Sequence, residues 1–414
     1  MSPAKFVWAA VLLCVATAAH AQWFFYQETD TEELFLTPVK HEQRAQDRKQ
    51  ALSDVKCPVE KIWAEGKQAV HKIGLDIGAD ISYTAQRVTP NGKQTAIQGI
   101  YYPYLTWNLF KDDTFGQGQL NINYTLIRYW GTQANVLQNR ANQVVAFNDY
   151  PNNQEFFSQF SYTHTLGGDL NWLSVTVGQI PLYNFDGTTY LDNQQTALFN
   201  DAMAQNASVA YPTASFGAYV QAQNEHFTVA GGYQDATNIT GQTIQLDTAF
   251  DGKYTVFGSV AWTPKFEIGQ GQYSMLYYYQ PSVEEQTGHV NGWSFNMQQN
   301  MGEHWVLFGR ANGSTNGVTP IKQSYVLGGG FLNPLKRNAQ DAILLGVAYN
   351  RLSERGLGYP PYVRAQEMAV ELQWIWGIGN LMTITPDVQF YPQAGFNSKH
   401  RMETVLGLRT TIML

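Results

Sequence analysis

Side chains able to catalyse a reaction or to hold a metal are few and scattered in this 414-residue chain. Beyond residue 21 no two histidines share a spacing typical of metal ligands. The sequence has no G-x-S-x-G, H-E-x-x-H or phosphate-binding glycine motif, and Cys57 is the only cysteine after residue 21. We therefore predict that the protein is not an enzyme and binds no metal or cofactor.

A larger set of charged and aromatic side chains recurs at every second residue, the spacing of one face of a β-strand. Asp76 and Asp80 share such a face, and so do Glu367 and Glu371, while apolar residues occupy the opposite face of both segments. If the apolar faces meet lipid, the residues that line a lumen are Asp76, Asp80, Tyr102, Tyr104, Glu367, Glu371, Asp387, Arg401, Glu403 and Arg409.

Two roles suit these inward side chains. Carboxylates and guanidinium groups can hydrogen-bond the hydroxyls of a passing solute, and tyrosine rings offer flat faces to sugar rings. The same groups can instead form a structural ladder that keeps a polar wall in register. Counting from the strand ends places Asp80, Glu371, Asp387 and Arg409 at similar height. We predict a belt of these residues that serves one role or both.

The elements that must position this belt are long two-faced strands. The chain has sixteen such segments, each about 9 to 14 residues, which is enough to cross a bilayer at a tilt. They lie near 73–86, 97–110, 117–130, 155–165, 171–180, 213–224, 227–235, 252–262, 270–280, 291–299, 304–312, 323–331, 342–350, 366–376, 381–390 and 402–414.

Three further patterns distinguish a membrane barrel from a soluble sandwich. Tryptophan and tyrosine gather near strand ends, as in the aromatic girdles of outer-membrane proteins. Long and short connections alternate almost throughout, and the longest, 131–154 and 181–212, are rich in Asn, Gln and aromatics. These two loops either fold into the lumen or shield the outer surface. The predicted fold is all-β, a transmembrane antiparallel barrel of about 16 strands with an aqueous lumen.

Composition supports this fold and excludes other classes. Charged residues make up only 14% of the chain and aromatic residues another 14%, which argues against disorder. Beyond the N-terminus no stretch approaches the ~20 apolar residues of a spanning helix. The net charge of −7 disfavours a nucleic-acid partner, since phosphate contacts require a basic surface.

The N-terminal region divides into two parts. Residues 1–21 have the basic start, apolar run and Ala19-His20-Ala21 ending of a signal peptide. Residues 22–72 carry 8 Lys/Arg and 9 Asp/Glu and are predicted to form a charged, helical arm on the periplasmic side. The barrel is predicted to occupy residues 73–414, so its C-terminus also lies on the periplasmic side.

One segment near the C-terminus, Pro386-Asp387-Val388-Gln389, is the most specific part of a collinear similarity that runs from about Trp63 to Leu414. In this similarity the chain resembles the OprB-type carbohydrate-selective porins. Further matching runs are Val177-Gly178-Gln179, Phe216-Gly217-Ala218, Leu345-Gly346-Val347-Ala348 and Gly407-Leu408-Arg409. The resemblance implies a sixteen-stranded outer-membrane porin with inward-folded loops that passes mono- and small oligosaccharides. The chain departs from the pattern by ending in Leu414 instead of an aromatic residue.

The function predicted from these observations is passive diffusion of small neutral sugars through a constricted lumen in the outer membrane of a Gram-negative cell. A general diffusion porin with mild cation preference is the first alternative, because the inward set is mainly acidic. A non-conducting adhesive or structural barrel is the second. We expect outer-membrane lipid to surround the barrel. The sequence leaves open which sugar passes and whether the protein is a homo-trimer.

Overall fold

The computed structural model describes residues 58–89, 94–241, 244–359, 363–396 and 402–414. The predicted signal peptide, most of the predicted arm and Arg401 lie outside these residues. Within the described chain, no helix is long and apolar enough to cross a membrane.

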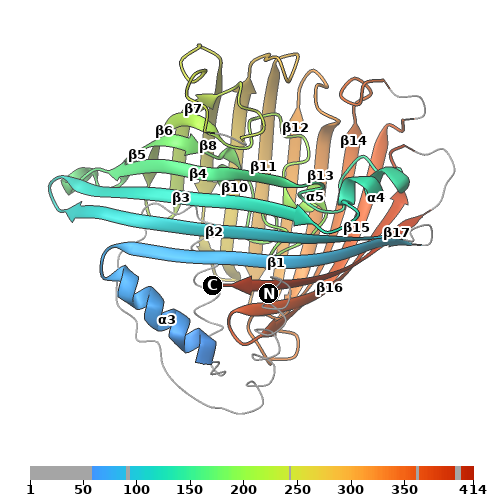
Figure 1. The fold of residues 1–414 in the computed structure, drawn as a ribbon, viewed down its shortest axis with the longest axis horizontal. Helices are drawn as coiled ribbons and strands as arrows, with labels where there is room; N and C mark the ends of the chain where they lie inside the picture. Colours follow the sequence, from blue (N-terminus) through green and yellow to red (C-terminus); the bar gives the residue numbers. More distant parts are fainter. Residues whose placement is uncertain (1–57, 90–93, 242–243, 360–362, 397–401) are drawn as a thin grey trace.

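Sixteen antiparallel strands form the wall of a closed barrel (Figure 1). The first eight are β1 (Leu75–Thr89), β2 (Thr95–Asp112), β3 (Gly116–Tyr129), β4 (Gln154–Thr165), β5 (Leu173–Ile180), β6 (Ser215–Gln223), β7 (Phe227–Asp235) and β8 (Tyr254–Trp262). The second eight are β10 (Gly269–Gln280), β11 (Val290–Met301), β12 (Trp305–Ser314), β13 (Ile321–Leu332), β14 (Ala342–Leu352), β15 (Gln366–Ile378), β16 (Met382–Gln393) and β17 (Glu403–Met413).

The barrel closes because the first strand pairs with the last. β1 pairs antiparallel with β2 on one side and with β17 on the other, so that Asp80 lies opposite both Tyr102 and Met413. The remaining short strand, β9 (Lys265–Phe266), pairs only with the start of β10. Closure leaves no unpaired strand edge inside the bilayer, where an unsatisfied backbone group would be costly.

Alternation along each strand separates an apolar outer face from a polar lumen face. On β15, Leu372 and Trp374 are exposed on the outside, whereas Glu371 and Gln373 are buried on the inside. Successive side chains of a strand point to opposite faces, so a two-residue repeat in the sequence becomes this division. The prediction of an all-β barrel of sixteen strands is confirmed, and most strand ends lie within two or three residues of the predicted ones.

The helices occur in the segment before β1 and in the connections between wall strands. α3 (Pro58–His71) precedes β1 and lies beyond the barrel wall in Figure 1. α3 lies within the last part of the segment 22–72 that is predicted to be helical, and residues 22–57 of that segment are outside the described chain. α4 (Ala134–Arg140) belongs to the connection between β3 and β4, while η2 (Leu182–Phe185) and α5 (Asp201–Ala204) belong to the connection between β5 and β6. A last short helix, η1 (Gly168–Leu170), lies in the turn between β4 and β5.

The two longest connections fill part of the lumen. Residues 130–153, here called the β3–β4 loop, and residues 181–214, the β5–β6 loop, contain many buried side chains that contact the inner faces of the strands. The sequence predicts that these loops either fold into the lumen or shield the outer surface, and the structure shows them folded into the lumen. The loops therefore define the narrow part of the barrel.

Candidate functional site

Two buried glutamates on β15 bind the backbones of the two inward loops. The Glu371 carboxylate accepts N–H bonds from Phe199 at 2.5 Å and Asn200 at 2.9 Å, both in the β5–β6 loop. The Glu367 carboxylate accepts bonds from Val144 and Val145 in the β3–β4 loop, each at 2.8 Å, and from Gly395. Because both glutamates are fully buried, these amides replace the water that a carboxylate otherwise requires.

Arg409 on β17 binds the same stretch of the β5–β6 loop through carbonyl groups. Its Nη1 donates to the carbonyl oxygens of Gln194 and Ala197, and its guanidinium lies 4.4 Å from the centre of the Phe199 ring. Beside it, Thr411 donates a hydrogen bond to the carbonyl oxygen of Gln195 at 2.6 Å. The β5–β6 loop thus offers carbonyl groups to Arg409 and Thr411. It offers N–H groups to the carboxylate of Glu371.

β11 and β12 bind the loop at further points. Arg310 on β12 donates to the carbonyl oxygen of Leu191. Asp186 in the loop accepts bonds from Ser294 at 2.5 Å and from Asn296 at 2.9 Å, both on β11. Ser208 donates to Asn312 on β12 at 2.8 Å. The β5–β6 loop is therefore fixed to β11 and β12 as well as to β15 and β17.

The two loops are also bonded to each other. The backbone N–H of Asp149 donates to the side-chain oxygen of Gln194 at 2.6 Å, and the N–H of Asp201 donates to the carbonyl oxygen of Ala146 at 3.2 Å. Gln205 donates a further bond to the Asp149 carboxylate. The loops form one composite constriction.

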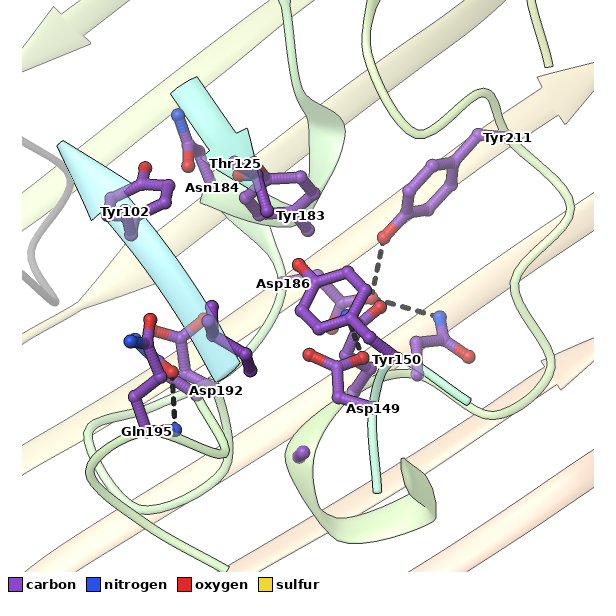
Figure 2. A pocket seen from close by; sticks show the side chains of 15 residues that line it. Tyr102, Thr125, Asp149, Tyr150, Tyr183, Asn184, Asp186, Asp192, Gln195 and Tyr211 are labelled. Carbon is purple, nitrogen blue, oxygen red and sulfur yellow. Dashed lines mark hydrogen bonds between the residues drawn. The ribbon is translucent and has the colours of Figure 1, made fainter. Parts of the chain in front are cut away.

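A cavity lies between this constriction and the inner face of β2 and β3 (Figure 2). It contains about 790 Å³ of space not filled by atoms, its open part included. Its lining is acidic, aromatic and amide-rich, with Tyr102, Thr125, Asp149, Tyr150, Tyr183, Asn184, Asp186, Asp192, Asn193, Gln195, Asn206 and Tyr211. In Figure 2 the rings of Tyr102 and Tyr183 lie on one side of the space and Asp149 with Tyr150 on the other.

The carboxyl groups between the loops are electrostatically perturbed. Burial raises the pKa of Asp149 well above its usual range, and the neighbouring Asp201 adds to this shift. Burial also raises the pKa of Asp201 to about 7, although the Arg310 guanidinium acts in the opposite direction. Asp201 is therefore a group whose charge changes near neutral pH.

The sequence-predicted site residues occupy three places. Asp80, Glu371, Asp387 and Arg409 are buried in the wall covered by the β5–β6 loop, where Gln195 also donates to the carbonyl oxygen of Asp80 at 3.1 Å. Glu367, also buried, meets the β3–β4 loop instead.

The remaining predicted residues lie elsewhere. Tyr102 lines the cavity, Tyr104 donates to the carbonyl oxygen of Leu414 at 3.4 Å, and exposed Asp76 lies 4.0 Å from Lys67 of α3. Arg401 lies outside the described residues. Contact of any of these residues with a solute stays a prediction.

Sequence reasoning missed the loop residues that line the cavity. Asp149, Tyr150, Tyr183 and Asp192 belong to no strand, so the two-residue repeat gives no information on where they point. The only available signal was the abundance of Asn, Gln and aromatic residues in the two long connections.

A closed sixteen-stranded barrel whose lumen is narrowed by inward loops has the architecture of an outer-membrane porin, a channel and not an enzyme. Within the described residues no group of three or more metal-binding side chains is arranged to hold an ion.

The particular family follows from comparison with known proteins. Residues 115–414 match the family model described as carbohydrate-selective porin, OprB family, and the chain belongs to this family. Porin AaxA of Chlamydia pneumoniae is 37% identical over 318 residues, which are 77% of this chain and 72% of the relative. Porin AaxA of Chlamydia felis is 34% identical over 326 residues, 78% of this chain and 73% of the relative.

A solved structure shares the fold. The high-pH structure of Pseudomonas putida OprB has a TM-score of 0.67 and 13% identity, and the match covers 85% of this chain and 97% of that one. The predicted resemblance to the OprB family is therefore confirmed.

Proposed function

We propose that this outer-membrane porin passes small, neutral, hydroxyl-rich solutes, namely mono- and small oligosaccharides. The observation that carries the proposal is the cavity at the constriction, where four tyrosines and five neutral amides surround one space. Tyrosine rings stack on the apolar faces of sugar rings, and amides donate to and accept from hydroxyl groups. The family description supports the same substrate class.

A liposome-swelling assay tests this proposal. Purified protein in vesicles should admit glucose fastest and maltose and maltotriose progressively more slowly. Non-sugar polyols and zwitterions of matched mass provide the comparison. Faster entry of the sugars is expected, because the aromatic and amide lining favours them. Equal entry of all solutes of one mass would contradict sugar selectivity and leave a general porin.

A mild preference for cations is a second candidate, favoured by a specific observation. Asp149, Asp186 and Asp192 all line the cavity, whereas no Lys or Arg does so among the described residues. A cluster of carboxylates at a narrow point attracts cations and repels anions. The two candidates are compatible, since a neutral sugar is indifferent to this field.

The placement of the chain in the membrane completes the proposal. The exposed apolar outer face suits outer-membrane lipid. The short turns, α3 and the C-terminus are assigned to the periplasmic side, with residues 1–21 as a signal peptide and 22–72 as an arm ahead of the barrel, 73–414. Protease added outside intact cells should cleave exposed outer connections such as 281–289 and spare α3. Cross-linking of the native membrane tests for a homo-trimer.

A further inference from the structure

β15 contacts both inward loops through two buried carboxylates. Glu367 and Glu371 lie four residues apart on its inner face, and each accepts two consecutive backbone N–H groups. The two amide pairs come from different loops and lie more than fifty residues apart in the sequence. One strand therefore holds both parts of the constriction.

We propose that Glu367 and Glu371 are positioning residues, each of which holds one constriction loop against β15 and so sets the width of the pore. They act through the loops and do not touch the solute. The proposal adds a role to the porin function and does not depend on which solute passes.

The chemistry of the contacts supports this assignment. An ionised carboxylate is an acceptor only, and two adjacent amides can satisfy both of its oxygens. Glu367 and Glu371 are both fully buried, so neither side chain is presented to a solute in the lumen. Removal of the Glu371 carboxylate leaves two N–H groups without an acceptor, and removal of the Glu367 carboxylate leaves three. The loop regains partners for them only by moving towards water.

Two glycines provide the close approach that the contacts require. A Cβ atom at Gly346, which lies opposite Glu371 on β14, would come within 2.8 Å of Leu198 in the β5–β6 loop. A Cβ atom at Gly395 would come within 2.6 Å of Val144 and 2.8 Å of the Glu367 carboxylate. Each glutamate thus has a neighbouring glycine that leaves room for its loop.

The test measures pore width in Glu367→Ala and Glu371→Ala. Single-channel conductance in planar bilayers is recorded with polyethylene glycols of increasing mass, which identifies the largest polymer that enters. We expect a roughly twofold rise in conductance and a higher polymer cut-off in each variant, because a loop leaves the constriction. The double variant should exceed either single one.

Gln373→Ala is the matched control. Gln373 lies on the same face of β15 and is equally buried, yet neither polar atom of its side chain has a hydrogen-bond partner. Its removal should leave conductance and cut-off unchanged. An equal rise in Gln373→Ala would mean that any cavity in this wall opens the pore, and would overturn the proposal.

A second pair of variants tests the Glu371 contact from the loop side, where the barrel wall is untouched. Phe199→Pro removes the N–H donor to Glu371, and Phe199→Ala retains it while losing the same ring. We expect the polymer cut-off of Phe199→Pro to be higher than that of Phe199→Ala. Wild-type width in both Phe199→Pro and Glu371→Ala would overturn the proposal, and so would equal widths in the two Phe199 variants.

Discussion

Two parts of the lumen wall use their polar side chains differently. On β15–β17, here the tethering wall, Glu367, Glu371 and Arg409 are at most 1% exposed and bond to the loops. On β2–β4, the amide wall, Thr106 and Asn121 are only partly buried and bond to each other at 3.2 Å. On these two walls, charge therefore serves mainly to hold the loops, whereas neutral groups face the open lumen.

This difference changes the meaning of an inward charge. A charged side chain that points into a barrel lumen does not necessarily face the passage, because a loop can cover it. The groups that remain available to a solute are the neutral amides of one wall and the acidic and aromatic side chains that the loops bring into the cavity. Four changes test this division.

The largest effect is expected from Arg409→Met on the tethering wall. The change removes two bonds to loop carbonyls and leaves Glu371 and Asp387 buried without the cation. We expect the free energy of unfolding to fall by about 3 kcal/mol, because two buried carbonyl groups lose their donor and two buried carboxyl groups lose a nearby positive charge. Urea unfolding followed by tryptophan fluorescence measures this loss. A loss below about 0.5 kcal/mol, typical of an exposed ion pair, would contradict the tethering role.

Neutralising the cavity should alter selectivity without comparable loss of stability. In Asp192→Asn, one carboxylate disappears from the lining while the wall is unchanged. We expect the ratio of cation to anion permeability to fall by roughly twofold. The reversal potential across a bilayer in a potassium chloride gradient gives this ratio. An unchanged potential would place the selecting charges elsewhere.

Selectivity should also depend on pH through Asp201. Its pKa is raised from 3.8 to about 7, so the group is mainly neutral at pH 6 and mainly charged at pH 8. We expect stronger cation preference at pH 8 than at pH 6, and a flatter profile in Asp201→Asn. The folded state binds the additional proton between about pH 4 and 7, so the contribution of Asp201 to stability falls as pH rises through this range. A profile identical in wild type and variant would exclude Asp201 as the titrating group.

The smallest effect is expected on the amide wall. Asn121→Ala with Asn123→Ala removes amides that bond only to neighbouring wall side chains, Thr106 and Gln159. Ion conductance should change by less than about a fifth, while the affinity for a blocking sugar should fall by about twofold, since each lost hydrogen bond is weak. Titration of conductance with maltotriose measures both quantities. A large change in conductance with unaltered sugar affinity would show that this wall also supports the loops.

The sequence predicts the wall far better than the constriction. β7 was predicted at 227–235 and is observed at Phe227–Asp235, because lipid on one side and water on the other impose a strict two-residue repeat. That repeat also correctly places Glu371 and Arg409 on the inner face.

The hydrogen-bond partners of Glu371 and Arg409 could not be predicted from this repeat. Whether Glu371 meets a solute or the amides of Phe199 and Asn200 depends on how a long loop packs, and loop packing has no period in the sequence. The acidic lining of the cavity was missed for the same reason, since Asp149 and Asp192 lie on the loops.

The most direct test of the function is single-channel conductance in planar bilayers during titration with glucose and longer maltodextrins from one side. We predict a small, steady conductance that falls saturably with sugar, because tyrosines and amides at the constriction hold the solute in the ion path. A large conductance that no sugar reduces would contradict a carbohydrate-selective constriction and leave a general diffusion porin.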